Sequence, residues 1–334
     1  MEFLNVIWFI LIMVLFTGFF ILEGFDYGVG TLLIGKNDYE RSMMIRSIGP
    51  VWDGNEVWMI TAGGAMFAAF PHVYATMFST FYLALFLMLV ALIFRGVAFE
   101  LRGKHPSKGW RCIWDCAITF GSLVPAILWG VAITNLLQGL PIDSQMHYLG
   151  NFFDLLSPYT ILGGVTFALV FAFHGASFLT LKMADESMRL MFKRQGLCIG
   201  VFATIIYVLF IAMTAVSTDI TSKITWIAPF AVSAVCFVNA WIAMKRGREL
   251  SSFIFSSMSI AGMVIGVFAG MFPRLMVSSL NPEWSLDIFN AASTPHTLAI
   301  MTGAAVVLVP IVLIYQGWTY KIFKARITPN DLNH

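Results

Sequence analysis

Charged residues are scarce in this chain, making up only 11% of its 334 positions, whereas a soluble domain has about 25%. Hydrophobic residues account for 59% of the chain. A chain of this composition has too little polar surface to fold in water, which argues against a soluble enzyme or binding module. The formal net charge of +2 gives no reason to expect a nucleic-acid partner.

Cysteine is also scarce, with four residues and no CxxC pair. This spacing argues against a disulfide framework and against a zinc site. Cys112 and Cys116 are four residues apart and share a helix face. We expect both to be ordinary buried thiols, as free cysteines usually are.

Long apolar runs separated by polar loops fill the sequence and predict about nine transmembrane helices, because a span needs roughly 20 apolar residues. The predicted spans are Phe3–Thr31, Ile48–Phe70, Tyr74–Val97, Trp110–Leu137, Pro158–Leu181, Gln195–Val216, Trp226–Met244, Ser251–Phe272 and Pro295–Tyr320. The chain is therefore predicted to be an all-α polytopic membrane protein forming a single integral membrane domain over residues 1–334. We expect two four-helix bundles, about 1–137 and about 158–272, plus one extra helix at about 295–320.

The distribution of basic residues predicts the orientation of the chain. With nine spans, all of the 20 Lys and Arg residues except Lys223 and Arg274 lie on one side of the membrane. Loops rich in Lys and Arg stay in the cytoplasm. The sequence therefore predicts an N-terminus outside the cell and a C-terminus in the cytoplasm.

Four carboxylates lie in the first two predicted spans. Glu23 and Asp26 are in ILEGFDYGVG, and Asp53 and Glu56 are in PVWDGNEVW. A charge at the centre of a span costs about 2.5 to 3.5 kcal/mol on insertion scales, and such residues often form proton relays. Residues three apart share a helix face, and the predicted topology puts both pairs in the cytoplasmic half of neighbouring helices. The pattern predicts a four-carboxylate cluster that conducts protons from the cytoplasm.

A structural role for these acids is the alternative. They could pair with Arg46 or Arg95, or cap the second helix near its start. Trp52 and Trp58 flank the second acidic pair, with Asn55 between them. We expect these three residues to pack inside the bundle around the acids.

Histidine is weighed separately because a haem protein would need it. His174 lies within the fifth predicted span, in FAFHGASF. A lone histidine in a membrane helix is more often hydrogen-bonded to a neighbouring helix than bound to a metal. We therefore expect His174 to be a packing residue.

Several segments resemble subunit II of the cytochrome bd-type quinol oxidases. The matching segments, spread over essentially the whole chain, are GFDYGVG, PVWDGNEVWMITAGGAMFAAFP, FRGVAFELRGK, WRCIWD, NLLQGLP, GNFFDLLSPY, FIFSSMSIAG, MFPRLMVSS and LVPIVLIYQGWTY. A coincidental match of this length is not credible.

The resemblance implies a function for the complex and a role for this chain within it. Subunit II of that family forms a heterodimer with subunit I, which holds two b-type haems and one d-type haem and oxidises quinol. Subunit II supplies no haem ligand and no metal ligand, and the complex reduces dioxygen to water with cytoplasmic protons. The family's proposed proton path falls on Glu23, Asp26 and Asp53 here. A structural quinone and a small accessory membrane subunit are further implied partners.

The sequence departs from the family pattern at three positions in or beside the acidic segments. Many members have His where this chain has Val51, Gln where it has Glu56, and Asp where it has Glu23. Glu56 could replace the missing histidine in the relay. Two other readings of the residues are a proton-coupled membrane transporter and a purely structural assembly partner of subunit I. The acids lie off the middle of the membrane and no repeat is evident, which favours the oxidase over the transporter.

Overall fold

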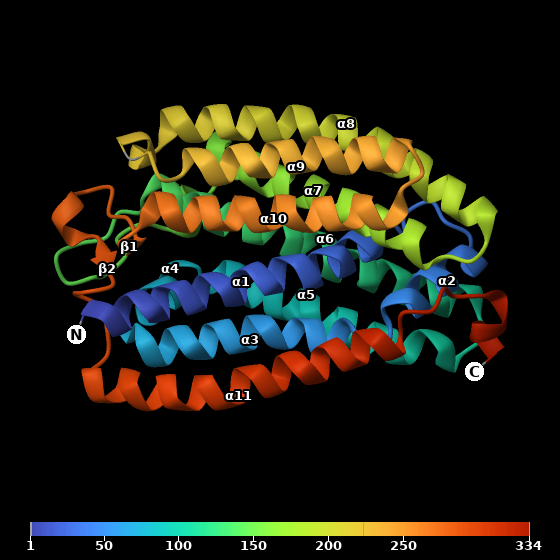
Figure 1. Ribbon diagram of the computed structural model, residues 1–334, viewed down its shortest axis with the longest axis horizontal. Coiled ribbons are helices and arrows are strands. Elements are labelled where there is room, and N and C mark those ends of the chain that lie inside the picture. Colours follow the sequence, from blue (N-terminus) through green and yellow to red (C-terminus); the bar gives the residue numbers. More distant parts are fainter. Residues whose placement is uncertain (1, 223, 334) are drawn as a thin grey trace.

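Long helices that run roughly along one axis make up the computed structural model, which describes residues 2–222 and 224–333 (Figure 1). Lys223, one of the two basic residues expected outside, is not among them. The described α-helices are α1 Glu2–Thr31, α2 Asp38–Ile48, α3 Trp52–Ala69, α4 Pro71–Thr80, α5 Tyr82–Leu101, α6 Lys108–Gln138, α7 Pro158–Lys182, α8 Glu186–Ser217, α9 Ile227–Lys245, α10 Glu249–Met271 and α11 Pro295–Ile322. The predicted all-α membrane fold is confirmed.

Among the described residues, eight helices are long and apolar enough to cross a membrane: α1 and α5 to α11. The second predicted span corresponds to α3, which is less apolar because its first turns hold Asp53, Asn55 and Glu56. Helix α3 nevertheless lies alongside α1 and α11 (Figure 1). The count of nine spans and the orientation stay predictions. The two ends of the chain lie at opposite ends of the long axis (Figure 1).

The structure differs from the predicted helices at three places. Helix α2 is a separate surface helix that starts at a capping box between Asn37 and Glu40. The third predicted span is broken at Phe81 into α4 and α5. Helix α8 begins nine residues before the predicted start, because the side chain of Asp185 accepts a hydrogen bond from the backbone of Ser187.

Helix α1 is central to the packing. It contacts α3 and α6 from the first predicted bundle and α7 and α10 from the second. Helix α11 packs on α1 and α3 and is otherwise exposed, with Leu298 as its buried residue. The division into two bundles plus one helix stays a prediction, with α1 in contact with both groups.

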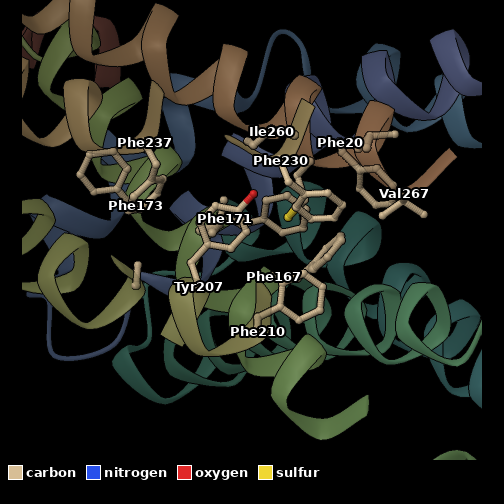
Figure 2. Close-up of a cluster of buried hydrophobic side chains, with 14 of the residues drawn as sticks. Phe20, Phe167, Phe171, Phe173, Tyr207, Phe210, Phe230, Phe237, Ile260 and Val267 are labelled. Carbon is tan, nitrogen blue, oxygen red and sulfur yellow. The ribbon is translucent and has the colours of Figure 1, made fainter. Parts of the chain in front are cut away.

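An aromatic core fills the space between α1, α7, α8, α9 and α10 (Figure 2). Its labelled members are Phe20, Phe167, Phe171, Phe173, Tyr207, Phe210, Phe230, Phe237, Ile260 and Val267. Ring pairs such as Phe20 and Phe167 meet edge to face, with centroids 5.6 Å apart. This core ties α1 to α7, so the acidic segment of α1 is held against a rigid neighbour.

The longest connection between helices in the described chain is the loop between α10 and α11. Strands β1 (Arg274–Met276) and β2 (Leu286–Asp287) pair antiparallel there, with Arg274 opposite Asp287. The prediction for the paired cysteines was wrong, because Cys112 and Cys116 are exposed on α6. Their helix face points away from the neighbouring helices, and sequence spacing alone does not fix which face packs.

Candidate functional site

Arg95 on α5 is the centre of a buried cluster of ionisable groups. Its side chain is fully buried and forms ion pairs with Glu23 of α1 and with Glu56 of α3, the latter at 3.4 Å. The guanidinium carbon lies 5.0 Å from the ring centre of Tyr27 and 5.6 Å from that of Phe99. A guanidinium stacked on aromatic rings is held by cation–π attraction in addition to its ion pairs. Three helices therefore contribute charge to one closed site.

Two glycines let the helices approach closely enough to form this cluster. A Cβ on Gly121 of α6 would lie 2.4 Å from the Cβ of Arg95 and 2.5 Å from the carbonyl oxygen of Ala91. A Cβ on Gly28 of α1 would lie 2.0 Å from the carbonyl oxygen of Phe171 on α7. Small residues at such points allow membrane helices to pack backbone to backbone. The glycines thus fix the positions of α5 and α1, which carry Arg95 and the first acidic pair.

Asp26 lies one turn after Glu23 and is also fully buried. Its carboxylate accepts a hydrogen bond of 2.7 Å from the side-chain amide of Asn55 on α3. The amide oxygen of Asn55 accepts in turn from the hydroxyl of Tyr320 on α11, also at 2.7 Å. A chain of polar groups therefore links the last helix to a carboxylate on the first.

Several polar atoms of the cluster are buried without a hydrogen-bond partner among the described residues. They are Nε and Nη2 of Arg95, one oxygen of Glu23 and one oxygen of Asp26. Buried polar groups in folded proteins almost always have partners, and internal water supplies those that the protein does not. Two carboxyls, those of Glu23 and Glu56, also share one guanidinium here, and a third, Asp26, lies one turn further along α1. The cluster is therefore suited to hold water and to exchange a proton.

The other predicted site residues lie around this cluster rather than within it. Asp53 is exposed in the first turn of α3, so the structure joins three of the four predicted carboxylates and leaves the fourth outside. Arg46 is exposed at the end of α2 and, among the described residues, forms no ion pair with the acids. Trp52 packs on Phe99, with ring centroids 4.9 Å apart. Trp58 packs against Gly18 of α1 and donates to Gln316 of α11 at 2.7 Å.

His174 is fully buried and uses both of its ring nitrogens. Nδ1 lies 2.7 Å from the hydroxyl of Ser256, and Nε2 lies 3.1 Å from the carbonyl oxygen of Ile21. The ring stacks on Phe253 with centroids 4.8 Å apart. These contacts join α7 to α1 and α10, as expected of a packing residue, and they leave no free ring nitrogen for haem iron.

Sequence reasoning missed two residues of α11. Tyr320 and Gln316 bind Asn55 and Trp58 respectively, and they lie four residues apart on one face of a helix that is otherwise apolar. Two polar side chains four residues apart in an apolar span were the sequence feature that could have indicated a polar contact with another helix. Nothing local in the sequence shows which helix they face.

The fold and the site define a polytopic membrane protein with a cluster of ionisable groups buried between its helices. The family model for cytochrome bd terminal oxidase subunit II matches residues 4–323. The chain belongs to that family. It is accordingly subunit II of an oxygen-reducing quinol oxidase and a multi-pass protein of the bacterial inner membrane.

Individual relatives agree with this assignment over the full length of the chain. The chain is 41% identical to cytochrome bd ubiquinol oxidase subunit 2 of Bacillus subtilis, over 99% of both proteins. It is 36% identical to cytochrome bd-I ubiquinol oxidase subunit 2 of Escherichia coli K12, over 99% of this chain and 97% of that protein. The fold is similar to a chain of the bd oxidase from Geobacillus thermodenitrificans, with a TM-score of 0.74 and 16% identity over 96% of this chain and 98% of that one.

Proposed function

We propose that this chain carries protons from the cytoplasm toward the oxygen-reducing centre of the oxidase. The route runs from Asp53 at the surface past Glu56 to Glu23 and Asp26. The observation that carries the proposal is the buried cluster around Arg95, in which Glu23 and Glu56 share one guanidinium, Asp26 lies one turn away, and polar atoms are buried without partners among the described residues. Acidic residues within a membrane, with water between them, commonly form proton relays.

Arg95 has a defined part in this route. A fixed positive charge lowers the cost of holding ionised carboxyls away from water, so an acid can lose its proton and regain it. Asn55 donates to Asp26 and steadies the ionised form of that carboxylate. The side chain of Glu56 is 18% exposed, so it lies between the exposed Asp53 and the fully buried Glu23. In this position an extra carboxylate can take the place of the family's histidine.

The rest of the complex follows from the family. We infer that the chain forms a heterodimer with subunit I, that subunit I holds two b-type haems and one d-type haem, and that the complex reduces dioxygen to water with electrons from quinol. The occupied ring nitrogens of His174 support placing the haems outside this chain. A structural quinone and a small accessory membrane subunit remain predicted partners. The transporter alternative is not favoured, since the family is that of an oxidase subunit.

The first test compares membranes that express this chain alone, the large subunit alone, or both chains. The haem d signal in a difference spectrum and quinol-driven oxygen uptake should appear when both chains are present. If the chain leaves both signals unchanged, it is not a working part of the oxidase.

The proton route itself is tested in the purified complex with Asp26→Asn and Asp53→Asn. Asp26→Asn should slow oxygen uptake the more strongly of the two, because Asp26 is closed off from water and bulk solvent cannot bypass it. Haem content should stay unchanged in both. Glu283→Gln is the matched control, since Glu283 is an exposed acid in the loop after α10. Normal turnover in Asp26→Asn would remove Asp26 from the route.

A further inference from the structure

A large cavity is lined by residues of α2 and of the C-terminal segment, and it lies on the other side of Phe99 from Arg95. Figure 1 shows α2 and the C-terminal segment at the same end of the bundle. Its volume is about 640 Å³, within the range of ligand-binding pockets. Its walls come from α2, the start of α3, the ends of α5, α7 and α11, and residues 323–331. This is the end on which the chain's basic residues gather, the predicted cytoplasmic side.

Basic side chains outnumber acidic ones in the lining. The basic ones are Arg46, Arg102, Lys182 and Arg326, and the acidic ones are Glu100 and Asp331. Three of the four cations are engaged within the protein. Arg102 binds Asp115 and Asp38, Arg326 binds Glu249, and Lys182 donates to the carbonyl oxygens of Phe323 and Ala325.

Arg46 differs from these three. Its side chain is exposed and forms no hydrogen bond or ion pair with any other described residue. A guanidinium presents a planar fork of donors that matches two oxygens of a phosphate. The cavity therefore has one guanidinium free to bind an anion.

The remaining lining is largely apolar. Ile45, Trp52, Phe99, Ile322 and Phe323 all face the cavity. Ile322 and Phe323 are also exposed on the outside of the protein, at 52% and 44%, at the end of α11, which is the least buried of the candidate spans. An inorganic anion would make no favourable contact with the apolar lining. An amphiphile with a phosphate next to apolar chains would bind both the guanidinium of Arg46 and the apolar side chains.

We propose that this cavity binds the headgroup of an anionic phospholipid from the cytoplasmic leaflet. Arg46 pairs with the phosphate, and Trp52 and Phe323 contact the glycerol esters and the first methylene groups. Basic pockets between membrane helices on the cytoplasmic side are suited to such headgroups, because that leaflet carries the anionic lipids. The proposal uses the predicted orientation and does not depend on the proton route.

The test measures lipid retention by the purified oxidase complex in nanodiscs that contain phosphatidylglycerol and phosphatidylcholine in equal amounts. Native mass spectrometry counts the lipids that stay bound after mild delipidation. The wild-type complex should retain phosphatidylglycerol in preference to phosphatidylcholine. Arg46→Gln should reduce that retention at least fivefold, and Arg46→Lys should restore part of it.

Arg246→Gln is the matched control, because Arg246 is an exposed arginine on the same side, at the end of α9 and outside the cavity. It should retain phosphatidylglycerol as the wild type does. Equal retention in Arg46→Gln and the wild type would overturn the proposal, as would equal retention of the two lipids. Displacement of the lipid by millimolar inorganic phosphate would show a free-phosphate site instead and would also overturn it.

Discussion

The hydroxyl of Tyr320 donates to the side-chain oxygen of Asn55 and thereby sets which end of that amide faces Asp26. An amide has one accepting and one donating end. With its oxygen held by Tyr320, Asn55 presents its NH₂ group to the carboxylate. Tyr320 on α11 therefore orients the amide of Asn55 on α3 toward Asp26 on α1.

Tyr320→Phe should lower oxygen uptake by the complex about two- to tenfold, the effect of losing one neutral hydrogen bond worth about 0.5 to 1.5 kcal/mol. The infrared band of the Asp26 carboxyl should also shift, which a loss of packing alone would not cause. Tyr315→Phe is the control, since Tyr315 is 64% exposed on the same helix. Unchanged uptake and an unchanged band would show that Tyr320 has no influence on Asp26.

Arg95→Gln should strongly destabilise the chain, because it leaves buried carboxylates without a counter-charge. Breaking a buried ion pair by removing one partner costs about 3 to 5 kcal/mol. The double variant with Glu23→Gln should recover much of the loss, since the pair is then removed together. The melting midpoint of the purified complex checks both, and Arg248→Gln is an exposed control. A double variant no more stable than Arg95→Gln would contradict the pairing.

Gly28→Ala should prevent the close approach of α1 and α7. The added methyl group would meet the carbonyl oxygen of Phe171 and the backbone of Gly175, neither of which can move aside. Gly64→Ala is the control on α3, where a Cβ would meet nothing within 4 Å. We expect little haem-loaded complex from the first variant and a normal yield from the second, measured by difference spectra of membranes. Equal yields would mean that α1 and α7 can separate without loss.

His174→Gln should leave the haem spectrum of the complex unchanged, because His174 binds Ser256 and Ile21 rather than a haem. The purified chain without subunit I should likewise show no Soret band. Loss of one haem signal from a variant complex that is otherwise assembled would reassign His174 as a ligand.

The helices and the first acidic pair could be predicted from the sequence because the membrane imposes a strong local rule. A long apolar run predicts a membrane span, and a carboxylate within such a run is costly unless it has a function or a partner. Glu23 and Asp26 meet this description, and the structure shows both fully buried. For the second pair, Asp53 and Glu56, the same rule does not predict which carboxylate is buried. Glu56 turns toward Arg95 while Asp53 stays exposed, because the rotation of α3 is set by its packing on α1 rather than by its own sequence.

Contacts between distant parts of the chain were beyond sequence reasoning for a similar reason. Tyr320 and Asn55 are 265 positions apart, and nothing local in the sequence shows that they meet. Arg95 was considered as one of two partners for the acids, and only the packing of α5 against α6 at Gly121 selects it over Arg46. The cavity beside Arg46 is likewise formed by segments from both ends of the chain.

The ion pair between Glu23 and Arg95 also bears on how the chain is inserted during synthesis. The two residues are 72 positions apart, so α1 leaves the ribosome well before α5. Each helix alone would bring an unpaired charge into lipid, at a cost of about 2.5 to 3.5 kcal/mol. We expect α1 to be retained at the insertion machinery until α5 arrives. Helices α1, α3, α4 and α5 would then enter the bilayer as one unit of biogenesis rather than one by one.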